Sequence, residues 1–337
     1  MTELPELLAR ARKIVHSQSA EAMALAGQAR EMARACNCAY SESLALTLYA
    51  RGLFMFGRSQ EAKDTLLQAL ELGERREIGT ARGEALQLIA RVAYTLGQYE
   101  QAADCWCACT ELGGEHIRPE ERIQAHIGLG QLCYAHDHFE LALAHHEQAA
   151  RLAENDDNAH LTCTSMLNIA ADLIRLQRCP EAAEVLKQTL PLVRADQNYQ
   201  FEAEIFSMFG QIRLIAGEIE AARMSLMVSL KINRLHINTW GESSVLLHLG
   251  ECSIMAREPD MATEQLGRAR MLAEAMGSMP LLADIYSQLA QLAELCEDGA
   301  AATEYRAQSE ALRRQLRAAA DSPRYATLEL RLSPDQV

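Results

Sequence analysis

The chain has 337 residues, is rich in alanine and leucine, and contains only 18 glycines and 8 prolines, a composition that favours helices throughout. Its 32 basic and 46 acidic residues give a formal net charge of −14 at pH 7 with no cluster of Lys and Arg, which argues against a surface for nucleic acid or for an anionic membrane. It has neither an apolar signal region nor a window of about 18 apolar residues, so we expect a cytoplasmic protein without a membrane span.

An alanine recurs every 40 residues along the chain, without insertion or deletion. The eight landmark alanines are Ala22, Ala62, Ala102, Ala142, Ala182, Ala222, Ala262 and Ala302. Seven residues after each landmark, at position +7, the residue is always small: Ala29, Ala69, Cys109, Ala149, Thr189, Ser229, Ala269 and Ser309. Position +10 is always a sizeable aliphatic residue. A fixed period of this kind indicates a repeat architecture.

Each period predicts two helices joined by a turn. Twelve residues before the landmark, at position −12, only Ala or Gly occurs from the second unit on: Ala50, Ala90, Gly130, Ala170, Gly210, Gly250 and Ala290. Small residues on both helices predict a close crossing. The predicted turn contains Gly57, Gly97 and Gly217, and predicted helix starts contain Pro119, Pro180, Pro259 and Pro280. Pro191 falls inside a predicted second helix, which it should kink or end early.

Two stretches carry a family resemblance. They are Ile89–Trp106, "IARVAYTLGQYEQAADCW", and Leu129–Ala149, "LGQLCYAHDHFELALAHHEQA". Both resemble tetratricopeptide repeats, whose signature positions match Gly130, Tyr99, Phe139 and the landmark alanines. The period is 40 residues rather than the commonest 34; this longer variety is similar to the repeats of kinesin light chains and of bacterial sensor and regulator proteins.

The resemblance implies an all-α fold, a right-handed α-solenoid (superhelix) of about eight helix-turn-helix units. It covers roughly residues 1–317, with the first and last units as polar caps. Residues 318–337 would then form a C-terminal tail or the start of a linker.

In such a solenoid the first helix of each pair lines a concave groove, so positions −14, −11 and −7 predict the residues that face a partner. The candidate groove residues are Arg51, Arg91, Gln131, Asn168, Arg175, Met208, Gln211, His248, Glu251 and Gln291. We expect a protein or peptide partner, with an acidic group near the arginines and with Met55, Met208 and Met255 as adaptable apolar contacts. Ordinary solvating side chains are the alternative interpretation.

The stretch Asp104–Arg118, "DCWCACTELGGEHIR", raises the question of a thiol or metal site. Cys109 occupies the small +7 position, and Trp106 stands where other units have leucine. Alternate helical residues lie about 200° apart, so Cys105 and Cys109 share a face while Cys107 points away. This favours thiols that serve as structural side chains, the alternative being Cys105 and Cys109 as metal ligands with a third ligand from a neighbouring helix.

The histidines of the next unit raise the same question. They are His136, His138, His145 and His146. His136 and His138 straddle a predicted turn, and His146 replaces a core leucine. We therefore expect a solvated loop with one buried histidine, and no metal.

No sequence signature of an enzyme occurs, so we expect neither catalysis nor a cofactor. The sequence does not indicate an oligomeric state. Two functions remain open. One is an adaptor that binds proteins or peptides in its groove. The other is a ligand- or peptide-responsive regulatory domain, since bacterial repeats of this kind resemble sensor modules that precede an effector such as a diguanylate cyclase or a DNA-binding domain.

Overall fold

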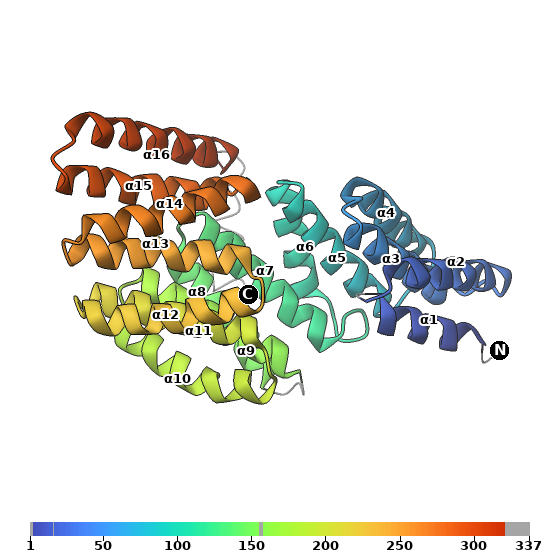
Figure 1. The fold of residues 1–337 in the computed structure, drawn as a ribbon. Coiled ribbons are helices and arrows are strands. Elements are labelled where there is room, and N and C mark those ends of the chain that lie inside the picture. Colours follow the sequence, from blue (N-terminus) through green and yellow to red (C-terminus); the bar gives the residue numbers. More distant parts are fainter. Residues whose placement is uncertain (1–2, 16, 155–157, 321–337) are drawn as a thin grey trace. The chain divides into compact units, whose positions relative to one another are not determined.

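The computed structural model describes residues 3–15, 17–154 and 158–320, which form sixteen helices and no strands (Figure 1). The helices are α1 Glu3–Ile14, α2 Ser19–Ala35, α3 Ala39–Met55, α4 Ser59–Arg75, α5 Ala81–Thr95, α6 Tyr99–Glu111, α7 Pro119–Ala135, α8 Phe139–Ala153, α9 Ala159–Arg175, α10 Cys179–Ala195, α11 Tyr199–Ile215, α12 Ile219–Leu235, α13 Thr239–Met255, α14 Pro259–Met276, α15 Met279–Leu295 and α16 Gly299–Ala320. Each odd-numbered helix pairs with the even-numbered helix that follows it. The predicted all-α solenoid of eight helix-turn-helix units is confirmed.

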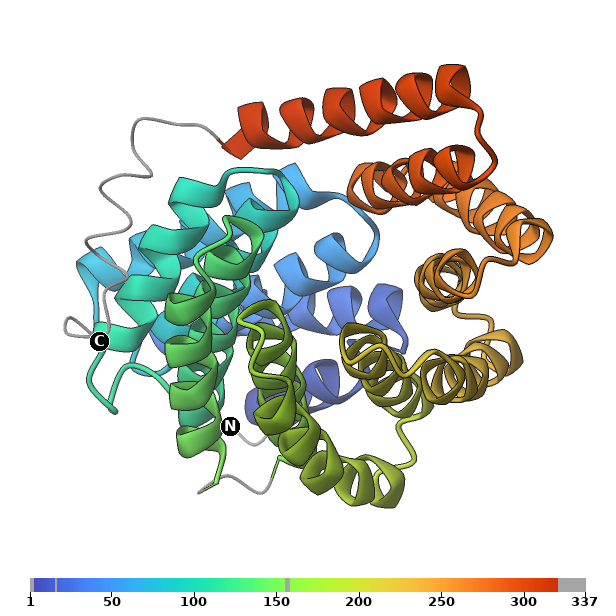
Figure 2. The same ribbon diagram turned by 90° about the vertical axis from the view of Figure 1, so that its left-hand side faces the viewer.

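The described residues form two compact parts of the chain, which we call unit 1 and unit 2 and describe separately. Without a number, the word unit continues to mean one helix-turn-helix repeat. Unit 1 runs to Ser165 and unit 2 begins at Met166, so the boundary falls inside α9. Within unit 2, the stacking of successive pairs can be followed in Figure 2 from yellow to red. The expected array over 1–317 and the tail over 318–337 stay predictions, and residues 321–337 lie outside the described residues. Within the described ranges, no helix combines the length and apolarity that a bilayer span requires.

The turn inside a pair has one backbone conformation from α3–α4 to α15–α16. The residue five before the landmark has a positive φ in all seven pairs: Gly57, Gly97, Asp137, Gln177, Gly217, Arg257 and Glu297. After α3, for example, the N–H of Arg58 donates to the carbonyl of Leu53 at 3.0 Å and closes the helix end. The three glycines expected in this turn are confirmed. Four units have a residue other than glycine here, namely Asp137, Gln177, Arg257 and Glu297. The fold tolerates them because the left-handed conformation costs only about 1–2 kcal/mol per residue.

The predicted close crossing is confirmed by what lies over the glycines at position −12. A Cβ on Gly130 would come within 2.3 Å of the His146 ring, and one on Gly210 within 2.5 Å of Leu226. Gly250 has the same relation to Leu266, at 2.6 Å. The side chain four residues after the landmark thus sits directly on the backbone of the preceding odd-numbered helix.

A second recurrent contact explains why position +7 is small. Side chains at +7 donate to the carbonyl at −19, or side chains at −19 donate to the carbonyl at +7. The pairs of the first kind are Ser229 with Ala203 (2.6 Å), Ser309 with Ala283 (2.7 Å) and Cys109 with Gly83 (3.8 Å). Those of the second kind are Ser43 with Ala69 (3.1 Å) and Ser243 with Ala269 (2.8 Å). A single short donor on either helix is enough to link the two.

The prolines behave as predicted at helix starts but not inside α10. All four expected prolines lie in first turns, those of α7, α10, α14 and α15. Pro191 does not end its helix early, because α10 continues to Ala195; a kink at Pro191 stays a prediction. Val193 is fully buried and Arg194 donates to Glu202 at 2.8 Å, so tertiary contacts hold the last turn despite the missing N–H.

Candidate partner-binding site

The candidate residues lie on one face of the odd-numbered helices. Positions −18, −14, −11 and −7 are spaced by four, three and four residues, so on an α-helix they form a single stripe. We call this stripe the odd-helix face. Positions −14, −11 and −7 were recognised from the sequence, whereas −18, which holds Glu84, Glu204 and Asp284, was not treated as a column of the face.

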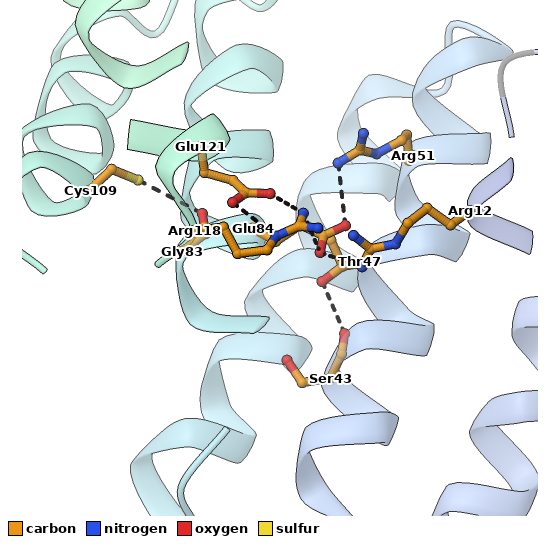
Figure 3. A network of polar contacts seen from close by, with 9 residues as sticks. All are labelled: Arg12, Ser43, Thr47, Arg51, Gly83, Glu84, Cys109, Arg118 and Glu121. Carbon is orange, nitrogen blue, oxygen red and sulfur yellow. Dashed lines mark hydrogen bonds and ion pairs between the residues drawn. The ribbon is translucent and has the colours of Figure 1, made fainter. Parts of the chain in front are cut away.

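On the odd-helix face of unit 1, one buried carboxylate gathers three guanidinium groups (Figure 3). Glu84 of α5 is only 3% exposed. It accepts from Arg12 of α1 at 2.8 Å, from Arg51 of α3 at 3.4 Å and from Arg118 at 3.4 Å. Burial of a carboxylate is costly unless it is paired, so Glu84 fixes arginines from neighbouring pairs around one point.

Arg118 extends this cluster to a second carboxylate. It is the residue before Pro119 at the start of α7, and its Nε donates to Glu121 of the same first turn at 3.1 Å. Burial raises the pKa of the Glu121 carboxyl, and the hydrogen bond from Arg118 opposes that shift. Three guanidinium groups thus meet two carboxylates, which leaves an excess of one positive charge, 3 − 2, when both acids are ionised.

Arg91 adds a further positive charge without a carboxylate. It is exposed and lies 40 residues after Arg51, at the same position of the next pair. Its guanidinium sits 5.9 Å from the centre of the Phe54 ring. Among the described residues no acid lies within ion-pair distance of it. The pKa of Arg91 is lowered, first by desolvation of its guanidinium and then by the positive charge of Arg51. Gln131, its counterpart on α7, is exposed as well.

The odd-helix face of unit 2 carries a mixed set of charges. Asp284 on α15 accepts from Arg313 at 2.8 Å, and its pKa is raised by desolvation, which Arg313, His248 and Arg175 oppose. His248 Nδ1 lies 3.5 Å from Glu251 on α13. These groups therefore share one electrostatic neighbourhood.

The remaining candidates of unit 2 differ in what they expose. Asn168 is half-buried, and its Nδ2 has no hydrogen-bond partner within the described residues. Gln211 is half-buried and Gln291 is exposed, but Met208 is only 7% exposed, so it offers little surface to a partner. Glu204, four residues before Met208, has a pKa raised by desolvation alone. Its acidity at position −18 is the signal by which it could have been found.

Solved structures of helical-repeat proteins resemble the chain over most of its length. The apo form of RapI has a TM-score of 0.70 at 13% identity and covers 82% of this chain and 99% of RapI. The Rap conjugation gene regulator of the plasmid pLS20, solved with the Phr* peptide, has a TM-score of 0.57 at 11% identity, with 95% and 98% covered. A tetratricopeptide repeat protein from Parabacteroides merdae has a TM-score of 0.53 at 14% identity, with 85% and 99% covered. No family model and no curated protein sequence matches the chain.

The chain has the tetratricopeptide-repeat fold. Its signature aromatic residues show how the fold is held at the turn. Tyr99 at the start of α6 packs against Tyr94 with ring centres 5.3 Å apart, and Phe139 at the start of α8 packs against Tyr134 at 5.4 Å. The two helices of each of these tetratricopeptide repeats are thus joined by an aromatic contact across the turn.

The cysteines of Asp104–Arg118 are part of the packing of this tetratricopeptide repeat. Cys109 is fully buried and Trp106 is 3% exposed, as expected for core positions. Cys105 and Cys107 are half-buried. Burial raises the pKa of the Cys105 thiol to about 11 and also raises that of Cys109, which keeps both thiols protonated and poor nucleophiles.

The histidines are more buried than the sequence predicted. The expectation of one buried histidine among the four is wrong, since both His145 and His146 are buried, at 2% and 1% exposed. A further histidine, His126 of α7, is 3% exposed. His126 and His145 contact each other through Nδ1 atoms 3.2 Å apart. The repeat register could have revealed the burial of His126, because the same position holds Leu46, Leu86, Met166, Phe206, Leu246 and Tyr286 in the other units, all of them large apolar or aromatic residues. In the part of the chain that the structure describes, no group of three metal-ligating side chains occurs.

Proposed function

We propose that this protein is a scaffold that binds a protein or peptide on its odd-helix faces, with an acidic group of the partner held by unit 1. The carrying observation is Arg91, an exposed guanidinium beside Arg51 that no carboxylate of the described residues neutralises. A carboxylate of the partner would relieve the repulsion between the two arginines and form charge-assisted hydrogen bonds.

The proposed binding residues are those of the two faces. They are Arg51, Arg91 and Gln131 in unit 1, and Asn168, Arg175, Met208, Gln211, His248, Glu251 and Gln291 in unit 2. The solved Rap regulator with its Phr* peptide supports a peptide as the kind of partner for this fold. We propose no reaction and no cofactor for it, and no nucleic acid or membrane as partner.

The test is affinity capture from a lysate of the native cell, read by mass spectrometry. We expect a partner that the wild type retains and that Arg51→Glu with Arg91→Glu loses. Because Arg51 also pairs with buried Glu84, Arg91→Glu alone is the cleaner variant, since Arg91 takes no part in that cluster.

The matched control reverses two charges elsewhere on unit 1. Lys63→Glu with Arg151→Glu makes the same change in net charge as the double variant but alters even-numbered helices, on which Lys63 is half-buried and Arg151 is exposed. Retention by the control and loss by Arg91→Glu would support the proposal. Equal retention by all variants would refute the assignment of the face.

A second proposal is a regulatory domain whose peptide signal leaves through its last helix toward an effector. It is supported by the length of α16, which has 22 residues where the other helices have 18 or fewer. Reading the native gene beyond the codon for Val337 tests it, because the proposal requires an effector domain in the same frame.

A further inference from the structure

One even-numbered helix of unit 2 has an apolar outer surface. Helix α12 buries Ala222, Leu226 and Ser229 against its neighbours. Its opposite side exposes Met224 (65%) and Met227 (58%). Val228 (41%) and Leu235 (74%) continue the exposed surface.

The corresponding positions of the other units show that this apolar surface is unusual. At the position of Met224 the other units have Ala24, Asp64, Asp104, Ala144, Glu184, Glu264 and Glu304. At the position of Val228 they have Gln28, Gln68, Ala108, Gln148, Gln188, Arg268 and Gln308. The fold therefore does not require an apolar side chain at these sites. Exposed apolar clusters without a structural cause mark interaction surfaces.

Two charged residues flank the apolar ones on the same stripe. Glu220 lies four residues before Met224, and Lys231 lies four residues after Met227. At 100° per residue these four side chains fall within about 60° of one another on the helix. Glu220 and Lys231 are exposed, and within the described chain neither has an ion-pair partner.

This order of residues is complementary to itself in the antiparallel direction. If Met224 faces Met227 of a second copy, then Glu220 faces Lys231 of that copy, and the same two contacts repeat at the other end. A parallel pair would instead place Glu220 against Glu220 and Lys231 against Lys231. Closed two-fold contacts of this kind are the commonest in homo-oligomers.

We infer that α12 is a dimerisation surface, on which a second copy of this chain packs its own α12 antiparallel with Met224 opposite Met227. Two methionines from each copy form the centre, and two Glu220–Lys231 ion pairs close its ends. Methionine is enriched at such interfaces because its side chain adapts to its neighbour.

The test is the mass of the full chain in solution by sedimentation equilibrium, against a monomer mass of 37.3 kDa. We expect twice that mass for the wild type. The variant Met224→Glu, Met227→Lys, Val228→Gln gives α12 the outer residues Glu184, Lys187 and Gln188 of α10, so it should fold, which circular dichroism checks, and be monomeric.

Charge exchange tests the register. Glu220→Lys alone should weaken the dimer at least tenfold, and Glu220→Lys with Lys231→Glu should restore it, because the exchanged pair is again complementary. A monomeric wild type, or a dimer that survives the triple variant, would overturn the inference. Failure of the double exchange to restore the dimer would overturn the antiparallel arrangement.

Discussion

His126 is a titratable residue in a place that suits leucine. Other units have Leu46, Leu86 and Leu246 at this position. Desolvation, and after it the nearby His145, lowers the pKa of His126 from 6.5 to about 3; Arg122 and Arg151 act in the same direction. The folded protein therefore keeps this ring neutral in conditions where the unfolded chain would protonate it.

The first prediction concerns acid stability. Because the folded pKa is depressed, the unfolded chain binds a proton first as the pH falls below 6.5. The free energy of unfolding should therefore decrease between pH 6.5 and about 3, by up to about 1.4 kcal/mol per pH unit. From pH 7.5 to 5.0 we expect His126 to account for a loss of about 2 kcal/mol.

Urea denaturation of the wild type and of His126→Leu at both pH values measures this loss. Carboxylates elsewhere contribute equally to both proteins, so the difference between their pH dependences reports on His126 together with its contact to His145. Identical pH dependences would contradict the prediction.

Ile237 is a second residue whose conformation does not suit it. It follows α12 with φ of 54° and is 87% exposed. Asn37 and Gly277 occupy the same position of their units with the same sign of φ. A β-branched residue is strained there, whereas Gly and Asn are tolerated.

The second prediction is that Ile237→Gly stabilises the protein by about 1 kcal/mol. The gain comes from release of backbone strain, since a side chain this exposed contributes little packing. A higher thermal midpoint than the wild type is the expected readout, and Ile237→Val, which keeps the branching, is the control. An unchanged or lower midpoint for the glycine variant would contradict this prediction.

At the scale of helices, the packing between successive pairs is specific to each pair. Trp106 of α6 lies over Gly128 of α7, where a Cβ would come within 2.2 Å of the indole ring. Four other units combine a leucine at the first position, Leu66, Leu186, Leu226 or Leu266, with a residue larger than glycine at the second. Leu66 precedes Leu88, for example.

The third prediction is a strong coupling between these two residues. Gly128→Leu should destabilise the protein by about 3 kcal/mol through overpacking. Trp106→Leu should recover most of that loss in the double variant, because the pair then matches Leu66 and Leu88. A double-mutant cycle in urea measures the coupling, and additive effects would contradict it.

The same contact shows which part of the fold the sequence predicts. The period, the turns and the close crossing inside a pair follow from residues within one unit, such as Gly130 and His146. Contacts between units depend on the angle between successive pairs, which no spacing encodes. Gly128, for example, stands at position −14, one of the three positions that predict groove residues, although Trp106 covers it.

The candidate site divides in the same way. Arg51 and Arg91 were found because they share one position in consecutive units. The pairing of Arg51 with Glu84 could not be found, since Glu84 also receives Arg12 from one neighbouring pair and Arg118 from another. The helix face on which a residue lies can be predicted from its position in the repeat. Its ion-pair partner depends on how successive helix pairs pack against each other.

At the scale of the molecule, the net charge of −14 predicts that the chain repels polyanions such as DNA. Polyanion binding depends on an excess of basic side chains that displace counterions. Here the excess of unit 1 is local, around Glu84, and is surrounded by an acidic protein.

The fourth prediction is therefore that double-stranded DNA is not bound. At about 150 mM salt, where the Debye length is about 8 Å, a 20-base-pair duplex should show no change in electrophoretic mobility. A retarded duplex whose affinity falls steeply with salt would contradict the prediction.

The left-handed residue shared by the seven turns has a consequence for how such a chain changes over generations. Since every turn from α3–α4 to α15–α16 bends the backbone in the same way at the same place, a genetic exchange at that codon joins the first helix of one unit to the second helix of another without altering the bend. Unequal exchange at these points would lengthen or shorten the array in whole steps of 40 residues, so copy number is a heritable variable that leaves each joint intact.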